Sequence, residues 1–186
     1  MARLLAALGS CLLCGVAFGQ PAKPEHPTGA DVVIDGMKST APPTWKAEKP
    51  ANRLRSYQFK LPHAAGDKED AELFVMPEQP GTLGDNLSQW KELFLLPPAK
   101  PKSDVLKEGK LTVGKATLHT LDIQGTYHVK NIPIEVGVKE VKPDWRMLAV
   151  LWESKDTKLA SIRLLGPTKT VEAHKAKFDE WVKKFK

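Results

Sequence analysis

The stretch LLGPTKTVEAHKAKF, residues 164–178, has the order of a phosphate-binding loop: a β-like run, a glycine turn with lysine and threonine, then a helical pattern. A P-loop needs the pattern GxxxxGK[ST], in which glycines free backbone amides to hold phosphate. Here Gly166 is followed by Pro167, which has no amide N–H, and no glycine stands immediately before the lysine. We therefore expect a turn that ends a strand, with Thr168 or Thr170 capping the helix that follows.

The histidines are not spaced as metal ligands. No two of them are two or four residues apart, the spacings that place ligands on one face of a strand or helix, and the HExxH motif is absent. On one continuous strand, Asp122 and His119 would point to opposite faces, and Asp122 lies six residues from His128. The sequence therefore predicts no metal ligands and no cofactor. The histidines are His26, His63, His119, His128 and His174.

Catalytic nucleophiles and acids also lack a recognisable pattern. No serine stands in a GxSxG elbow. The segment GDKEDAE, residues 66–72, concentrates four acids but does not match a calcium-binding loop, so we expect a solvated turn between strands. Its acids are Asp67, Glu69, Asp70 and Glu72. Carboxylate pairs of the glycosidase kind are defined by their separation in space, so an enzyme whose acids converge only in the fold stays open.

The N-terminal segment predicts export. A short positive start at Arg3 precedes the apolar run Leu4–Phe18, and small residues around Phe18 mark a cleavage site. We expect residues 1–19 to be a signal peptide that is cleaved after Gly19. The run is shorter than the roughly 20 residues that span a bilayer as a helix, so we expect contact with the membrane only through this segment or through a lipid anchor.

A lipid anchor is the competing interpretation of the same segment. Leu8-Gly9-Ser10-Cys11 resembles a lipobox, in which Cys11 would be lipidated and become the first residue. Cys14 is less suitable because Leu13 precedes it. Since these are the two cysteines of the chain, the mature domain would contain no disulfide, thiol nucleophile or cysteine metal site.

The composition is that of a soluble globular protein, with 41% hydrophobic and 27% charged residues in a chain of 186. The net charge of +6 is spread along the chain, which indicates a solvated surface. FDEWVKKFK near the C-terminus mixes lysines with aromatic residues, but its aromatic residues share one apolar stripe. We therefore expect no nucleic-acid partner.

Proline separates the predicted signal peptide from the domain. Residues 20–44 are proline-rich and predict a spacer and an irregular lead-in, and residues 45–186 a single domain. We expect strands over residues 53–61 and 71–76, and a nearly all-β region over residues 105–165. In that region, the change of parity from Leu118 to Leu121 suggests a bulge, residues 131–138 alternate, and the run WRMLAVLWE at 145–153 predicts a central strand covered on both faces.

Two helices interrupt the strands. Leu83, Leu87, Trp90 and Phe94 recur at helical spacing, with Thr82 or Asp85 as the cap. A second stripe predicts a terminal helix over about 170–185. The expected fold is therefore α+β: a mainly antiparallel sheet covered by two amphipathic helices.

Several segments together resemble a family of exported proteins of planctomycete bacteria, some of them predicted lipoproteins; the segments are DGMKSTAPPTWKAEKPANRLRSYQFKLP, GDKEDAELFVM, NLSQWKELF, GTY, WRMLAVLWE and IRLLGPTKTV. This resemblance implies no activity. The order of strands, mid-chain helix, β meander and terminal helix is also similar to PsbP, the extrinsic subunit of photosystem II. That resemblance implies a PsbP-like sandwich and no site residues.

The sequence favours an exported, periplasmic or envelope-associated domain that binds or supports an envelope protein or polymer without catalysis. Two alternatives remain. A hydrolase or sugar-active enzyme would show two facing carboxylates in a deep pocket. A small-ligand carrier would show an apolar cavity between sheet and helix. A binding module would instead expose an aromatic patch, for which Trp45 and Trp145 are candidates.

Overall fold

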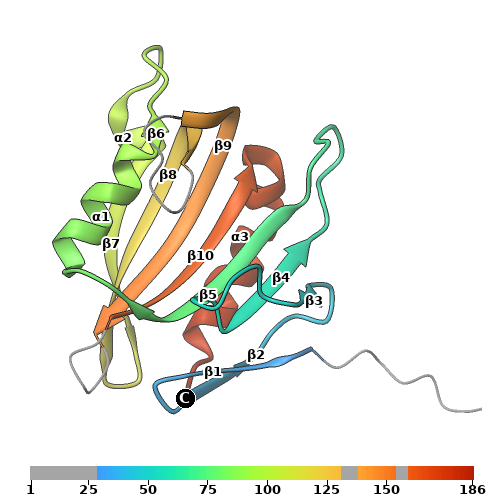
Figure 1. Ribbon diagram of the computed structural model, residues 1–186, viewed down its shortest axis with the longest axis vertical. Helices are drawn as coiled ribbons and strands as arrows, with labels where there is room; N and C mark the ends of the chain where they lie inside the picture. Colours follow the sequence, from blue (N-terminus) through green and yellow to red (C-terminus); the bar gives the residue numbers. More distant parts are fainter. Residues whose placement is uncertain (1–28, 131–137, 154–158) are drawn as a thin grey trace, which may run out of the picture.

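The computed structural model describes residues 29–130, 138–153 and 159–186 (Figure 1). The predicted signal peptide, its cleavage after Gly19, and Cys11 lie outside the described residues. So do residues 131–137 of the predicted alternating strand and the predicted turn at 155–157.

Strands dominate the order of elements. In chain order, the elements are β1 (Asp31–Ile34), β2 (Met37–Thr40), β3 (Lys46–Glu48), β4 (Tyr57–Leu61), β5 (Ala71–Gln79), α1 (Leu83–Glu92), β6 (Phe94–Leu95), α2 (Lys102–Val105), β7 (Leu106–Val113), β8 (Ala116–Lys130), β9 (Val138–Glu153), β10 (Leu159–Pro167) and α3 (Thr168–Lys183).

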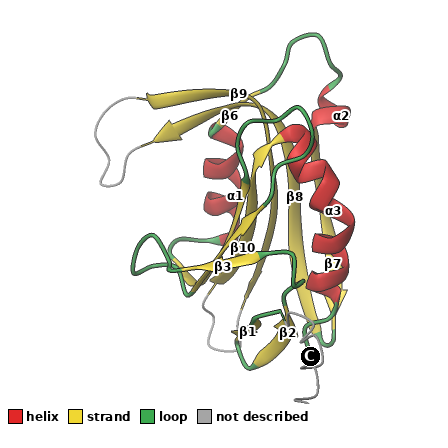
Figure 2. Cartoon of the chain, turned by 90° about the vertical axis from the view of Figure 1, so that its right-hand side faces the viewer, coloured by secondary structure: helices red, strands yellow, loops and turns green. Residues whose placement is uncertain are grey.

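The main sheet is antiparallel and lies between α1 and α3. Within the described residues it has eight strands in the order β3-β4-β5-β10-β9-β8-β6, and β7 also pairs with β8. Figure 2 shows α1 and α3 on opposite sides of the sheet. The predicted α+β class, a mainly antiparallel sheet covered by two helices, is confirmed, and the structure adds that the two helices lie on opposite faces.

Strand β9 shows why both faces are apolar. Along its second half, alternate residues are buried in two separate clusters: Leu148, Val150 and Trp152 pack with α3, and Met147, Ala149 and Leu151 pack with Trp90 of α1. We call these two sides of the sheet the α3 face and the α1 face. The predicted central strand covered on both faces is confirmed.

The two-face arrangement also corrects the expected bulge between Leu118 and Leu121. Leu118 is buried on the α3 face and Leu121 on the α1 face, while pairing with β9 runs without interruption from His119 to Gly125. The parity change therefore reflects burial on both faces of β8. The register of β8 and β9 shifts instead between Gly125 and Tyr127, and again between Val129 and Lys130.

The expected irregular lead-in contains a β-hairpin. Strands β1 and β2 pair across a turn in which Asp35 and Gly36 have φ of 50° and 77°. Val32 and Ile34 are buried in the same cluster as Trp45. The packed part of the chain therefore begins before residue 45, because this hairpin supplies apolar side chains to the α3 face.

Capping distinguishes the two long helices. Thr82 caps α1 and forms a reciprocal capping box with Asp85, so both predicted candidates take part. Neither Thr168 nor Thr170 caps α3, whose N-cap position is Pro167, and that prediction was wrong. The carboxylate of Asp67 instead accepts from the Thr170 N–H at 2.9 Å and from its hydroxyl at 2.7 Å. A loop residue thus supplies the cap.

Candidate functional site

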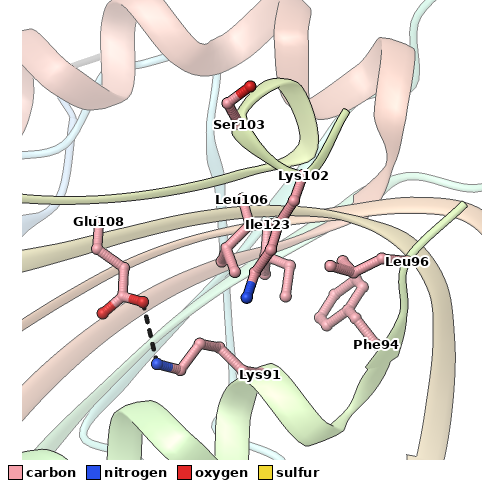
Figure 3. Close-up of a pocket in the computed structure, with 8 residues that line it drawn as sticks. All are labelled: Lys91, Phe94, Leu96, Lys102, Ser103, Leu106, Glu108 and Ile123. Carbon is pink, nitrogen blue, oxygen red and sulfur yellow. Dashed lines mark hydrogen bonds and ion pairs between the residues drawn. The ribbon is translucent and has the colours of Figure 1, made fainter. Parts of the chain in front are cut away.

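A groove lies where the edge of β8 passes from one short partner strand to another. Strand β7 pairs with β8 up to Ile123, and β6 pairs with it at Thr126 and Tyr127. The chain between β6 and β7 leaves the sheet through α2, so side chains of α1, β6, α2 and β7 surround the junction. The groove has a volume of about 630 Å³ and is shown in Figure 3.

The groove combines an apolar floor with basic side chains. Figure 3 shows Lys102 reaching into it from α2 and Lys91 approaching from the end of α1. Lys91 Nζ lies 3.0 Å from Glu108 Oε1. Lys102 is exposed and has no ion pair with any carboxylate of the described residues. The apolar lining is Phe94, Leu96, Leu106 and Ile123.

Local sequence determines how close the strands approach here. A Cβ atom at Gly125 would lie 2.4 Å from the carbonyl oxygen of Leu95, so a residue with a side chain would push β6 away from β8. The α1 stripe ends at Phe94, which is buried and lies 5.2 Å from the Tyr127 ring, between centroids. These contacts fix the wall of the groove that β6 forms.

The groove chemistry favours binding of a molecule with an apolar part and a negative charge. Apolar side chains on the floor gain by covering a hydrocarbon segment. Of the two lysines, Lys91 already has a carboxylate partner, and Lys102 would attract an anion. Glu108 is the single carboxylate among the described lining residues, so the groove does not present the facing pair that acid–base hydrolysis uses.

The acid-rich segment at 66–72 forms the expected solvent-facing turn between β4 and β5, and its carboxylates have partners on other elements. Asp67 caps α3, and Glu69 lies 2.8 Å from Lys142 on β9. Glu72 lies 2.8 Å from Arg55. Hydrogen bonds from the His63 ring and amide hold the pKa of Asp70 below its usual value. The four carboxylates diverge to different elements and do not assemble a site.

The residues tested for metal binding also lie apart. Asp122 forms two hydrogen bonds with Arg146 on the α3 face, and Glu172 of α3 contacts the same guanidinium. These carboxylates raise the pKa of Arg146, with the Asp122 hydrogen bonds as the largest cause. His174 is buried and its Nε2 lies 3.0 Å from the Pro62 carbonyl oxygen. Among the described residues, no group of three or more metal-ligating side chains is present.

The two tryptophans proposed as an exposed patch have different surroundings. Trp45 is buried against Phe59 and Trp181, so it offers no binding surface. Trp145 is half-buried and stacks on Tyr127 at 5.6 Å between ring centroids. The flat aromatic patch expected of a binding module is therefore reduced to the Trp145 side of the sheet.

Sequence patterns did not indicate the groove. Lys102 lies in the segment PPAKPKS, whose prolines predict only the end of a helix, and Glu108 is one of several charges on an edge strand. The one available signal was the proline-bounded interruption between α1 and the β meander, which allows the chain to leave the sheet.

Comparisons with known proteins bear on the fold alone. No protein-family profile matches the chain, and no curated protein matches it. The solution structure of cyanobacterial PsbP (CyanoP) from Synechocystis sp. PCC 6803 is similar, with a TM-score of 0.46 and 16% sequence identity, over 91% of this chain and 98% of that one. None of the helices in the described ranges is long and apolar enough to cross a membrane.

Proposed function

We propose that this chain is an exported, non-enzymatic binding module whose groove holds an anionic amphiphile, a molecule with an acyl chain and a carboxylate or phosphate head. The observation that carries the proposal is Lys102, which has no ion pair within the described residues, above the apolar floor of Leu106 and Ile123. The groove volume of about 630 Å³ falls within the range of small-molecule sites. This combines the binding-module and small-ligand alternatives that the sequence left open.

Export supports a ligand of this kind. The predicted signal peptide would deliver the domain to the cell envelope. Anionic lipids form the membrane surfaces there, and their breakdown products are solutes. The N-terminus of the protein from its native source tests this part separately. Mass spectrometry should find Gln20 first. A lipidated Cys11 in its place would show a membrane anchor instead of cleavage after Gly19.

Calorimetric titration of the purified protein with dodecanoate tests the groove. Two comparison ligands separate the contributions: acetate carries the charge without the chain, and dodecyltrimethylammonium carries the chain with the opposite charge. We expect dodecanoate to bind more tightly than either. The methyl NMR signals of Leu106 and Ile123 should shift with dodecanoate, which locates the ligand on the groove floor.

A charge reversal provides the matched variants. Lys102→Glu should weaken dodecanoate binding about tenfold, a loss of about 1.4 kcal/mol, because it replaces attraction by repulsion at the groove. Lys100→Glu makes the same change of net charge at an exposed lysine outside the groove and should leave the affinity unchanged. Equal binding by both variants, or preference for the cationic amphiphile, would exclude this function.

A further inference from the structure

Arg163 is a half-buried cation on the α1 face. It lies on β10, directly opposite Phe74 of β5 in the strand register. Its Cζ atom lies 4.7 Å from the centroid of the Phe74 ring and 4.8 Å from that of Trp90 on α1. The guanidinium is therefore placed against two aromatic rings, which attract a cation but provide no hydrogen-bond acceptor.

The hydrogen-bond inventory of Arg163 is incomplete. A guanidinium has five N–H donors and needs acceptors for those that are buried. Here Nη2 donates to the Sδ atom of Met76 at 2.8 Å, which is a weak acceptor, and the buried Nε–H has no partner. No carboxylate of the described residues forms an ion pair with Arg163. Burial lowers the pKa of Arg163 to about 10.

A second arginine makes the local charge imbalance larger. Arg55 lies over the same Phe74 ring, with its Cζ atom 3.9 Å from the centroid. It is paired with Glu72 at 2.8 Å and with the Gln58 amide oxygen. Two guanidinium groups therefore share one aromatic ring, and the nearby carboxylate is already bound to one of them. The other, Arg163, has no ion pair with a carboxylate in the described part of the chain.

Tyr127 is a neutral hydrogen-bond donor on the same face of the sheet. Burial raises the pKa of its phenol, and the charges of Arg163 and Arg55 oppose that rise. Stacking on Trp145 and contact with Phe94 hold the ring in place. Its hydroxyl forms no hydrogen bond with a described residue. Tyr127, Glu72 and Arg163 each remain partly exposed, so this part of the face is open to a small solute.

We propose that Arg163, with the Tyr127 hydroxyl on the same face of the sheet and Arg55 contributing charge, binds the oxyanion group of a small ligand, either a carboxylate or a phosphate. Two oxygens of such a group match the planar fork of a guanidinium. A neutral ligand would leave the buried cation without compensation, and a cation would be repelled by both arginines. The site uses none of the groove residues, so it is independent of the amphiphile proposal.

NMR titration of the full chain with inorganic phosphate, and separately with acetate, tests the site. Chloride replaces each anion so that ionic strength is constant. We expect saturable shifts of the Arg163 Nε–Hε signal and of the Trp90 indole N–H signal, with the more tightly bound anion identifying the head group. Shifts that follow ionic strength alone, without saturation, would overturn the proposal.

Three variants separate binding from a structural role. Arg163→Met removes the guanidinium but keeps an apolar stem, and should weaken binding at least tenfold. Tyr127→Phe keeps the stacked ring and removes only the hydroxyl, so it should fold normally and bind several-fold more weakly. Arg53→Met removes one exposed charge near β4 and should bind like the unmodified protein. Unchanged affinity in both Arg163→Met and Tyr127→Phe would refute the assignment.

Discussion

Asp67 caps α3 from outside the helix, and replacing it isolates the contribution of that cap. In Asp67→Ala, the Thr170 N–H and hydroxyl lose the acceptor that now lies 2.9 and 2.7 Å away. Thr170 is fully buried, and its hydroxyl oxygen also accepts from the Ala64 N–H at 3.0 Å. Because Thr170 is fully buried, its hydroxyl and N–H lose their acceptor together, and the cost is that of a lost cap and an unsatisfied donor.

The expected loss is about 2 kcal/mol of the free energy of unfolding. Removing a helix cap costs about 0.5–2 kcal/mol, and leaving a buried donor unpaired costs about 1–3 kcal/mol. The two costs are not added, because both describe the loss of the same carboxylate acceptor. Asp67→Asn keeps an acceptor and loses only the charge near the helix N-terminus, so about 0.5–1 kcal/mol should be lost. Urea unfolding at neutral pH, followed by tryptophan fluorescence, measures both.

The control is Glu180→Ala, which removes an exposed carboxylate of α3 that has no hydrogen bond or ion pair within the described residues. It should change the free energy of unfolding by less than about 0.5 kcal/mol. A loss in Asp67→Ala no greater than in Glu180→Ala would show that α3 does not depend on this carboxylate, and the remote-cap reasoning would fail.

Three further predictions follow from other contacts. Gly125→Ala places a Cβ atom 2.4 Å from the Leu95 carbonyl oxygen. It should lower the free energy of unfolding in urea by about 1–3 kcal/mol and speed amide exchange in β6. Unaltered amide exchange would contradict the close approach of the two strands. Hydrogen bonds from His63 lower the pKa of Asp70 in the folded state, so the ionised carboxylate stabilises the fold. Asp70→Asn should therefore be less stable than the unmodified protein at about pH 5, and this difference should disappear as pH falls below about 4. A difference in stability that persists at lower pH would contradict this pKa shift. Burial raises the pKa of Tyr127, so folding favours the neutral phenol and this contribution to stability is lost as pH rises above about 10. In an absorbance titration of tyrosine ionisation, Tyr127→Phe should remove the component that ionises at higher pH.

Helices and the central strand were predictable because their patterns depend on nearby residues. The spacing of Trp90 on α1, and of Phe178 and Trp181 on α3, follows from helix geometry alone, and all three are buried as expected. The run around Val150 is apolar at successive positions, which indicates a strand covered on both faces. The same reasoning explains the change of parity on β8. Leu118 is buried on one face of the sheet and Leu121 on the other, so apolar residues occur at both parities without a bulge between them.

The β1–β2 hairpin also has a signal in the sequence. Asp35-Gly36 between short apolar runs is the preferred dipeptide for a tight hairpin turn, because both residues adopt positive φ there. The prolines that follow suggested irregular structure instead. In contrast, the cap at Thr170 comes from Asp67, 103 residues away, and no local pattern can indicate such a partner.

The extent of helix coverage explains why the groove and Arg163 both lie on the α1 face. Adjacent strands are about 4.8 Å apart and a helix is about 10 Å wide, so one helix covers about two strands. On the α3 face, the 16-residue α3 is joined by the β1–β2 hairpin. On the α1 face, the 10-residue α1 packs over β8 and β9, and the strands beyond must be covered by their own side chains. Arg55 and Arg163 serve this purpose by lying over Phe74.

Packing alone does not require a charge at position 163. A methionine there would cover Phe74 without the cost of desolvating a guanidinium, and replacing buried charges by apolar residues is often neutral or stabilising. Arg163→Met should therefore be at least as stable as the unmodified protein in phosphate-free buffer. Stability of the unmodified protein should rise with phosphate, because a ligand stabilises the state that binds it, and stability of the variant should not. If Arg163→Met is much less stable than the unmodified protein without phosphate, the contacts of the guanidinium with the aromatic rings stabilise the fold by themselves. In that case no ligand is needed to explain an arginine at this position.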